Sequence, residues 1–350
     1  MSRFFGSMFR ESYMPYVTEY FRRWRAFLLA ILLLCCLGEA SVAFAQGPTW
    51  TRIGSKIMRV EDLVIDPVTP TTLYAGTFRG GVFRSTNAGG RWRAINTGLT
   101  DDSVKALASD PATPTTFYVG TLYGGVFKST DAGGRWRAIN TGLTELRVWK
   151  LAIDPVTPTT LYAGTDGGGV FKSTNGGGSW SASNTGLTKL RVWALRIDRA
   201  TPTTLYVGTV GGGVFKSTNG GGSWRAINSG LRGDGVTALA IDPVTPTTLY
   251  VGTIGGGVSK STDGGGSWSA SNIDVIPVSI EALAIDPATP TTLYAGTVGG
   301  GVFKSTNGGG SWRAINTGLR GDGVTALVID PATPTTVYAG TISSGVFVLR

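Results

Sequence analysis

The chain has 350 residues, a formal net charge of +9, 53 Gly, no His and two Cys. The two Cys, Cys35 and Cys36, lie in an apolar stretch near the N-terminus. The remainder of the chain therefore excludes a Cys/His zinc site, a His general base, a Cys nucleophile and a disulfide framework. We expect no metal site and no cofactor.

Residues 1–45 have the features of a secretory signal peptide. Five Arg fall within residues 1–25, an apolar run follows at 26–38, and Ala43-Phe44-Ala45 forms an A-x-A cleavage site. The run is short for a membrane span, which needs about 20 residues. We expect cleavage and a periplasmic or secreted chain; the alternative is an uncleaved membrane anchor.

Removal of residues 1–45 takes away five Arg and three Glu, so the charge falls from +9 to +7. The remaining Lys and Arg recur singly at fixed repeat positions, as solvated charges that protect sheet edges do. We therefore expect no nucleic-acid partner.

A 44-residue period runs through residues 46–350. It is marked by seven Asp residues, each within a near-copy of LAIDPVTPTTLYAGT: Asp66, Asp110, Asp154, Asp198, Asp242, Asp286 and Asp330. A strand-and-turn repeat of this length is typical of one propeller blade per repeat. We expect these Asp residues to cap the following turns instead of binding metal.

Residues 148–184 illustrate one predicted blade. Runs at 148–154, 160–165, 170–174 and 179–183 are separated by Pro-rich or Gly-rich turns, which predicts a four-stranded meander with strands a to d. The chain ends on a strand c, at 345–350, while residues 50–53 form a strand d without a blade before it. We predict one all-β, seven-bladed propeller over residues 46–350, closed by the N-terminal strand.

The turn between strands c and d reads Ser173-Thr-Asn175-Gly-Gly-Gly-Ser-Trp180 and recurs in six repeats. It resembles the Asp-box (BNR) motif, S-x-D/N-x-G-x-x-W, in which the hydroxyl and Asx side chains bond the turn's own backbone. The whole repeat reads DPxxPTTLYAGT followed by GGVFKSTDGGxSW. This pattern resembles that of bacterial BNR-like propellers, which are related to photosystem II assembly-factor, sortilin-type and xyloglucanase propellers.

The a–b and c–d turns are nearly invariant between repeats, whereas the d–a and b–c segments vary. Loops that vary on a fixed scaffold are the better place for binding. Repeats 3 and 4 carry Arg147-Val-Trp149 and Arg191-Val-Trp193 at the start of their innermost strands. Neighbouring b–c turns add three further candidates: Arg79, Tyr123 and Asp166.

These residues predict an aromatic and basic patch, with Trp stacking on a sugar ring or apolar side chain and Arg pairing with a carboxylate. The alternative is that both Trp fill space between adjacent blades. Arg196, which replaces Ala or Val on an innermost strand, either pairs with a carboxylate or reaches into the channel.

We expect a monomeric, non-catalytic binding or assembly scaffold that presents its variable face to a protein or polysaccharide. A glycan-active enzyme is the alternative. Arg59, Arg147 and Arg191 imitate the Arg triad that a sialidase resemblance would imply, but no Tyr-Glu pair accompanies them. Glu61, Glu145 and Asp166 are the carboxylates on the right face for glycoside hydrolysis, which needs a pair.

Overall fold

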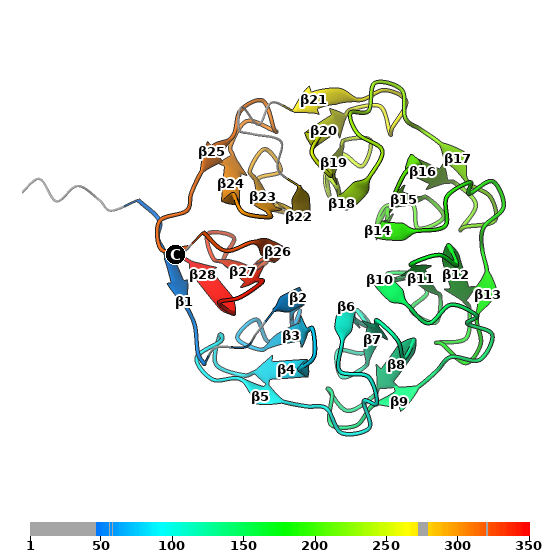
Figure 1. Ribbon diagram of the computed structural model, residues 1–350, viewed down its shortest axis with the longest axis horizontal. Coiled ribbons are helices and arrows are strands. Elements are labelled where there is room, and N and C mark those ends of the chain that lie inside the picture. The colour runs from blue at the N-terminus through cyan, green and yellow to red at the C-terminus, as the bar shows by residue number, and fades with distance from the viewer. Residues whose placement is uncertain (1–46, 56, 58, 272–278, 320) are drawn as a thin grey trace, which may run out of the picture. The chain divides into compact units, whose positions relative to one another are not determined.

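The computed structural model describes residues 47–350 except 56, 58, 272–278 and 320. All regular elements in these residues are strands, and they form seven antiparallel four-stranded sheets. The sheets are arranged radially around a common centre (Figure 1). The predicted all-β, seven-bladed propeller is confirmed. The predicted signal peptide, residues 1–45, lies outside the described residues.

Each blade contributes strands a to d, from the channel to the rim. The a strands are β2 (Val60–Ile65), β6 (Val104–Ser109), β10 (Val148–Ile153), β14 (Val192–Ile197), β18 (Val236–Ile241), β22 (Ile280–Ile285) and β26 (Val324–Ile329). The b strands are β3 (Leu73–Thr77), β7 (Phe117–Thr121), β11 (Leu161–Thr165), β15 (Leu205–Thr209), β19 (Leu249–Thr253), β23 (Leu293–Thr297) and β27 (Val337–Thr341).

The c strands are β4 (Gly81–Ser85), β8 (Val126–Ser129), β12 (Val170–Ser173), β16 (Gly213–Ser217), β20 (Gly257–Ser261), β24 (Gly301–Ser305) and β28 (Val346–Leu349). The d strands are β5 (Arg93–Ala94), β9 (Arg137–Ala138), β13 (Ser181–Ala182), β17 (Arg225–Ala226), β21 (Ser269–Ser271), β25 (Arg313–Ala314) and β1 (Trp50–Arg52). Blades 1 to 7 are numbered from β2 onward. The strand expected over 179–183 is shortened to two residues.

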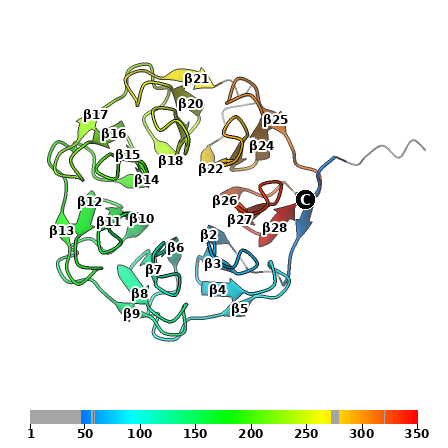
Figure 2. The same cartoon turned by 180° about the vertical axis from the view of Figure 1, so that it is seen from behind.

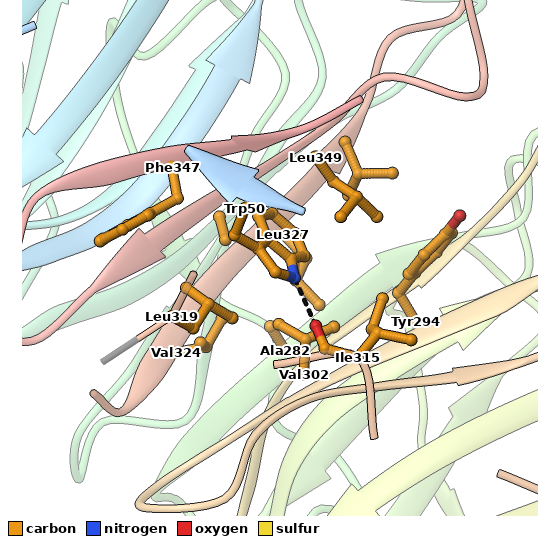
Figure 3. Packing of buried hydrophobic residues seen from close by; sticks show 12 residues of the cluster. Trp50, Ala282, Tyr294, Val302, Ile315, Leu319, Val324, Leu327, Phe347 and Leu349 are labelled. Atoms are coloured by element: carbon orange, nitrogen blue, oxygen red, sulfur yellow. Dashed lines mark hydrogen bonds between the residues drawn. The ribbon is translucent and has the colours of Figure 1, made fainter. Parts of the chain in front are cut away.

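The seventh blade joins the two ends of the described chain. Strand β1 pairs with β28, with Trp50 opposite Leu349, so blue β1 lies beside red β28 in Figure 1. The Trp50 side chain is 2% exposed, and its Nε1 donates a 2.6 Å hydrogen bond to the Ile315 carbonyl of blade 6 (Figure 3). In the sheet order β1-β28-β27-β26, this pairing makes β28 an inner strand and leaves β1 as the outermost strand of the blade.

The hydrophobic core lies between blades. One cluster combines Tyr162 and Val170 of blade 3 with Leu195, Phe215 and Trp224 of blade 4, and the other clusters join successive blades in the same way. This packing requires Gly in the b strands, because a Cβ at position 164 would lie 2.7 Å from a methyl carbon of Val192. Each blade is therefore stabilised mainly by its neighbours.

The invariant turns bond to themselves, as the sequence predicts. In the c–d turn of blade 3, Gly177 N donates to Ser173 Oγ at 3.0 Å and Ser179 N donates to Asn175 Oδ1 at 2.9 Å. At the a–b turn, Asp154 Oδ1 accepts hydrogen bonds from two backbone amides two and three residues later. All seven repeat Asp residues cap their turns in this way.

Candidate functional site

A β-bulge near the start of every a strand places one variable residue of each blade at the channel. The register shifts between Val148 and Lys150, for example, so Trp149 is the extra residue of β10. The equivalent bulge residues are Glu61, Lys105, Trp149, Trp193, Thr237, Glu281 and Thr325. Because the a strands are the innermost strands of all seven blades (Figure 2), these seven bulge positions form a ring whose residue type changes from blade to blade.

Two of the bulge residues connect neighbouring blades. Thr237 Oγ1 donates to the Gly252 carbonyl of its own blade at 3.1 Å and to the Ile280 carbonyl of blade 6. Thr325 makes the same two kinds of bond, to Gly340 and to Val60 of blade 1. Thr at this position is therefore a structural connector. The charged residues in blades 1, 2 and 6 and the Trp residues in blades 3 and 4 are the departures.

Trp149 and Trp193 stack on each other across the boundary between blades 3 and 4. Their ring centroids are 4.8 Å apart and their planes differ by 12°. Both residues are half-buried, and both Nε1 atoms are buried with no hydrogen-bond partner among the described residues. The sequence prediction that these residues are neighbours is correct, and the mutual stack also fills space between the two blades, as the alternative held.

A cation lies over each indole. Lys105 Nζ is 4.7 Å from the Trp149 ring centroid, and Arg191 Cζ is 5.2 Å from that of Trp193. Such contacts contribute about 0.5–2 kcal/mol each, depending on desolvation. Lys105 is only 6% exposed, whereas Arg191 is 52% exposed. A ligand that stacks on the Trp193 ring must therefore share or displace the position of Arg191.

Asp166 links the two Arg residues of the predicted patch. Its Oδ1 lies 2.8 Å from Arg191 Nε, and its Oδ2 lies 3.5 Å from Arg147 Nη1. Arg147 also pairs with Glu145 at 3.1 Å. This bonding to Arg147 lowers the pKa of Glu145, so its carboxylate is charged at neutral pH. Asp166 is mostly buried while both guanidinium groups remain about half exposed, so the carboxylate orients cations that can still meet a ligand.

A second group of cations lies in blades 1 and 2. Glu61 pairs with Arg59 at 2.7 Å and with Lys105 at 3.0 Å. Arg59 and Arg79 lie over the Phe78 ring, at 4.7 and 5.0 Å from its centroid. Since Lys105 also contacts Trp149, this group is continuous with the Trp pair. Arg59 thus pairs with a carboxylate other than Asp166, unlike Arg147 and Arg191.

Tyr123 belongs to the same face and is 67% exposed. Its position is fixed through the backbone, because Asp101 Oδ2 accepts hydrogen bonds from the amides of Tyr123 and Gly124 at 2.6 and 2.8 Å. Sequence reasoning did not single out Phe78. The available signal was its place in the b–c turn, where other blades carry different residues.

Charged side chains continue from the bulge ring along the channel. Burial raises the pKa of Asp62 and lowers that of Lys150, and each charge partly offsets the shift of the other. Burial likewise raises the pKa of Glu281. Arg196 is in no ion pair with a described residue. Its Nη1 donates to the Leu195 carbonyl at 3.1 Å, and its charge interacts electrostatically with Asp62 of blade 1. No group of three potential metal ligands occurs in the part of the chain that the structure describes.

No protein-family model matches the chain, and no curated protein matches it. Solved structures are similar to its fold. The GH74 xyloglucanase from Xanthomonas campestris is 19% identical with a TM-score of 0.72, over 86% of this chain and 53% of that one. YCF48 bound to a D1 peptide is 12% identical with a TM-score of 0.65, over 88% and 96%.

A third similar structure is the extracellular domain of a putative hybrid two-component system from B. thetaiotaomicron. It is 15% identical with a TM-score of 0.68, over 87% of this chain and 42% of that one. The chain spans about half the length of the GH74 enzymes, 53%, 46% and 53% of three of them. These proteins share the propeller fold while having different roles. Within the described residues, no helix has the length and apolar character needed to cross a membrane.

Proposed function

We propose that this protein is a non-catalytic extracytoplasmic scaffold that binds a protein or polysaccharide through the face carrying the d–a and b–c segments. The binding surface consists of Arg147, Arg191 and Tyr123, backed by the stacked Trp149 and Trp193. The single observation that carries the proposal is that Asp166 holds two half-exposed guanidinium groups from adjacent blades beside that Trp pair.

The proposed partner group is a carboxylate next to an apolar or sugar surface. Guanidinium groups bind carboxylates through paired hydrogen bonds, and exposed Arg147 and Arg191 retain donors for this purpose. Asp166 and the Trp stack restrict the motion of these cations before binding, which lowers the entropy lost on association. Arg79, stacked on Phe78, extends the basic surface toward blade 1.

Several expectations from the sequence belong to this proposal. They are export by a cleaved signal peptide at 1–45, a folded domain over 46–350, a monomeric state, and kinship with bacterial Asp-box propellers. The similarity to an extracellular domain supports the location. The YCF48 structure with a peptide and the GH74 enzymes support partners of the two kinds named.

The proposal is tested with residues 46–350 on a glycan array and by pull-down from the cell envelope. A Trp149→Thr/Trp193→Thr variant carries the residue that blades 5 and 7 use at the bulge, and Arg147→Ser/Arg191→Ser carries that of blades 2 and 6. We expect both folded variants to lose the ligand. Arg225→Ser/Arg313→Ser, which removes the same charge from exposed d-strand positions, should retain it.

The two partner classes give different results in this experiment, because a polysaccharide is retained on the array and a protein is recovered from the envelope. A ligand that binds all four proteins equally would contradict the assigned surface. Loss of binding in the Arg225→Ser/Arg313→Ser control would reduce the interaction to nonspecific attraction by the basic chain.

A glycan-active enzyme is the second candidate. Burial raises the pKa of Asp62 and of Glu281, which is the direction of shift that a general acid needs. Glu145 is unsuited to that role, since bonding to Arg147 lowers its pKa. Release of reducing sugar from xyloglucan or a sialoglycan by the wild type, abolished in Glu281→Gln or Asp62→Asn, would replace the scaffold proposal.

A further inference from the structure

A groove at the rim between blades 1 and 2 differs from the surface described above. It encloses a cavity of about 840 Å³ on the side of the c–d turns, which the sequence predicted to be scaffold only. Three Arg residues line it, Arg84 of β4 and Arg91 and Arg93 around the start of β5. The other wall is the c–d turn of blade 2, residues 131–134.

The corresponding position in blades 2 to 5 is closed by a hydrogen bond between blades. The Lys of each c strand donates to the carbonyl of a Gly in the next blade's c–d turn: Lys128 to Gly176, Lys172 to Gly220, Lys216 to Gly264 and Lys260 to Gly308. In blade 3 the hydroxyl of Tyr162 donates to the same Gly220 carbonyl, at 3.0 Å. In these four blades the Lys ammonium group is thereby bonded within the fold.

Blade 1 lacks this closure. Its equivalents of Lys172, Tyr162 and Gly220 are Arg84, Tyr74 and Ala132. Tyr74 is 1% exposed, yet its hydroxyl has no hydrogen-bond partner among the described residues, and neither has the buried Nε of Arg84. A buried donor without an acceptor lowers the stability of the fold by about 1–3 kcal/mol. Two such donors at one place indicate either a ligand that supplies acceptors or a local change that removed them.

The Ala132 methyl group explains the loss of the bonds. A Cβ placed at Gly220 would lie 3.3 Å from Lys172 Nζ and 3.5 Å from Tyr162 Oη, in the approach of both donors to the carbonyl. Ala132 carries that Cβ at φ 57°, a left-handed conformation that costs an L-residue energy. The methyl group therefore separates Arg84 and Tyr74 from the carbonyl that their equivalents use.

The groove also has an excess of positive charge. None of Arg84, Arg91 and Arg93 is in an ion pair with a described residue, whereas blade 3 has Ser179 and Ser181 in place of the last two. Asp131 is the only acidic residue in the lining, and its Oδ1 already accepts hydrogen bonds from Ser129 Oγ and Arg135 N within the turn. Its single charge does not balance three guanidinium groups.

We propose that this groove binds a phosphate or sulfate group. A tetrahedral oxyanion has enough acceptor oxygens for the forked guanidinium donors of Arg84, Arg91 and Arg93, which all line the groove. More than one negative charge matches three cations better than a single carboxylate does. The volume admits a group attached to a larger molecule as well as a free ion.

Two variants that copy other blades test the site. Arg84→Lys/Ala132→Gly restores the blade 3 arrangement, and Arg91→Ser/Arg93→Ser changes exposed residues only. Titration calorimetry at constant ionic strength would use inorganic phosphate, inorganic sulfate and dextran sulfate, with neutral dextran as the blank. We expect the wild type to bind, and each variant to bind about tenfold or more weakly. Arg225→Ser/Arg313→Ser, with the same charge change elsewhere, should bind as the wild type does.

The probes distinguish the two sources of the group. Binding of the inorganic ions indicates a site for a free anion, whereas groove-dependent binding of dextran sulfate alone indicates a group carried by a polymer. No binding of any of the three by folded wild type overturns the proposal. Equal weakening in Arg225→Ser/Arg313→Ser does so too, because the attraction would then follow net charge. This site lies outside the surface assigned under the proposed function, so the two proposals fail independently.

Discussion

At the a–b turns, all seven repeat Asp residues accept the same backbone hydrogen bonds, whereas the seven bulge residues of the a strands include Glu, Lys, Trp and Thr. The difference follows from what each position must bond. A turn residue satisfies amides of its own backbone, so substitution leaves donors unpaired. A bulge residue is left out of the ladder, so its side chain can change without breaking the strand pairing of its blade.

The same contrast exists between grooves. Blades 3 and 4 meet through Lys172, Tyr162 and Gly220, while blades 1 and 2 meet through Arg84, Tyr74 and Ala132. Relative to blades 3 and 4, the basic groove combines Ala132 in place of Gly, Arg84 in place of Lys, and Arg91 and Arg93 in place of Ser. Because the repeats are nearly identical, a residue that differs from its equivalents in the other blades is a candidate for function, whereas a residue shared by all blades is a candidate for a structural role.

The largest effect should come from the closing strand. Trp50→Ala removes a fully buried indole and its bond to Ile315, which should lower the free energy of unfolding by about 3–5 kcal/mol in urea denaturation. Thr51→Ala, at an exposed position of β1, should change it by less than about 0.5 kcal/mol. Similar values for the two variants would mean that blade 7 is stable without the β1 contacts.

Substitution of two Gly residues distinguishes the cost of a strained backbone conformation from the cost of a steric clash with a neighbouring blade. Gly186 and Gly211 have φ near 80°, but a Cβ at Gly186 would lie 2.2 Å from the Trp224 carbonyl oxygen, while a Cβ at Gly211 meets nothing within 4 Å. Gly211→Ala should cost about 1–2 kcal/mol, the left-handed strain alone. Gly186→Ala should cost at least about 1 kcal/mol more, because the neighbouring blade must shift. Equal losses in the free energy of unfolding for the two variants would show that the interface between blades 3 and 4 accommodates the added methyl group without strain.

Ala132→Gly should have the opposite sign. It relieves an Ala at φ 57° and should raise the free energy of unfolding by about 1 kcal/mol. Ala138→Gly, in the exposed strand β9, should instead lower it by about 0.5–1 kcal/mol through backbone entropy. A loss of stability in Ala132→Gly would indicate that the methyl group contributes packing to the groove that outweighs its strain.

The smallest effect concerns a channel carboxylate. Burial raises the pKa of Glu281, so the folded chain binds the proton of this carboxyl more tightly than the unfolded chain does. The free energy of unfolding therefore falls as the pH rises from the ordinary Glu pKa to the raised pKa of the folded chain. Glu281→Gln should therefore be more stable than wild type at pH 7, with the gain fading below the ordinary Glu pKa of 4.5.

Glu145→Gln is the matched control for this titration. The pKa of Glu145 is lowered by Arg147, so its carboxylate contributes stability at neutral pH that is lost as pH falls through the lowered value. The substitution should destabilise slightly at pH 7. Urea midpoints at neutral and acidic pH check both signs, and equal behaviour of the two variants would contradict the difference in burial.

The blade number, strand order and terminal pairing followed from sequence, because the period, the Gly-rich turns and the split repeat each correspond to one local structure. The closeness of Trp149 and Trp193 followed from their identical repeat positions. The cations over the two rings did not, since Lys105 and Arg191 reach them through side-chain conformations that no spacing encodes. The open groove was also missed, because it depends on one methyl group at Ala132 acting on a different blade.

The pairing of β1 with β28 has a kinetic consequence. Trp50 and Ile315 are 265 positions apart, so this contact forms only after almost the whole chain has been synthesised and ordered. Proteins dominated by contacts of high sequence separation fold slowly, because the entropy of closing long loops must be lost before those contacts form. Intermediates in which β1 has not yet paired would expose the outer edge of β28, and the chain should be vulnerable to aggregation until that pairing forms.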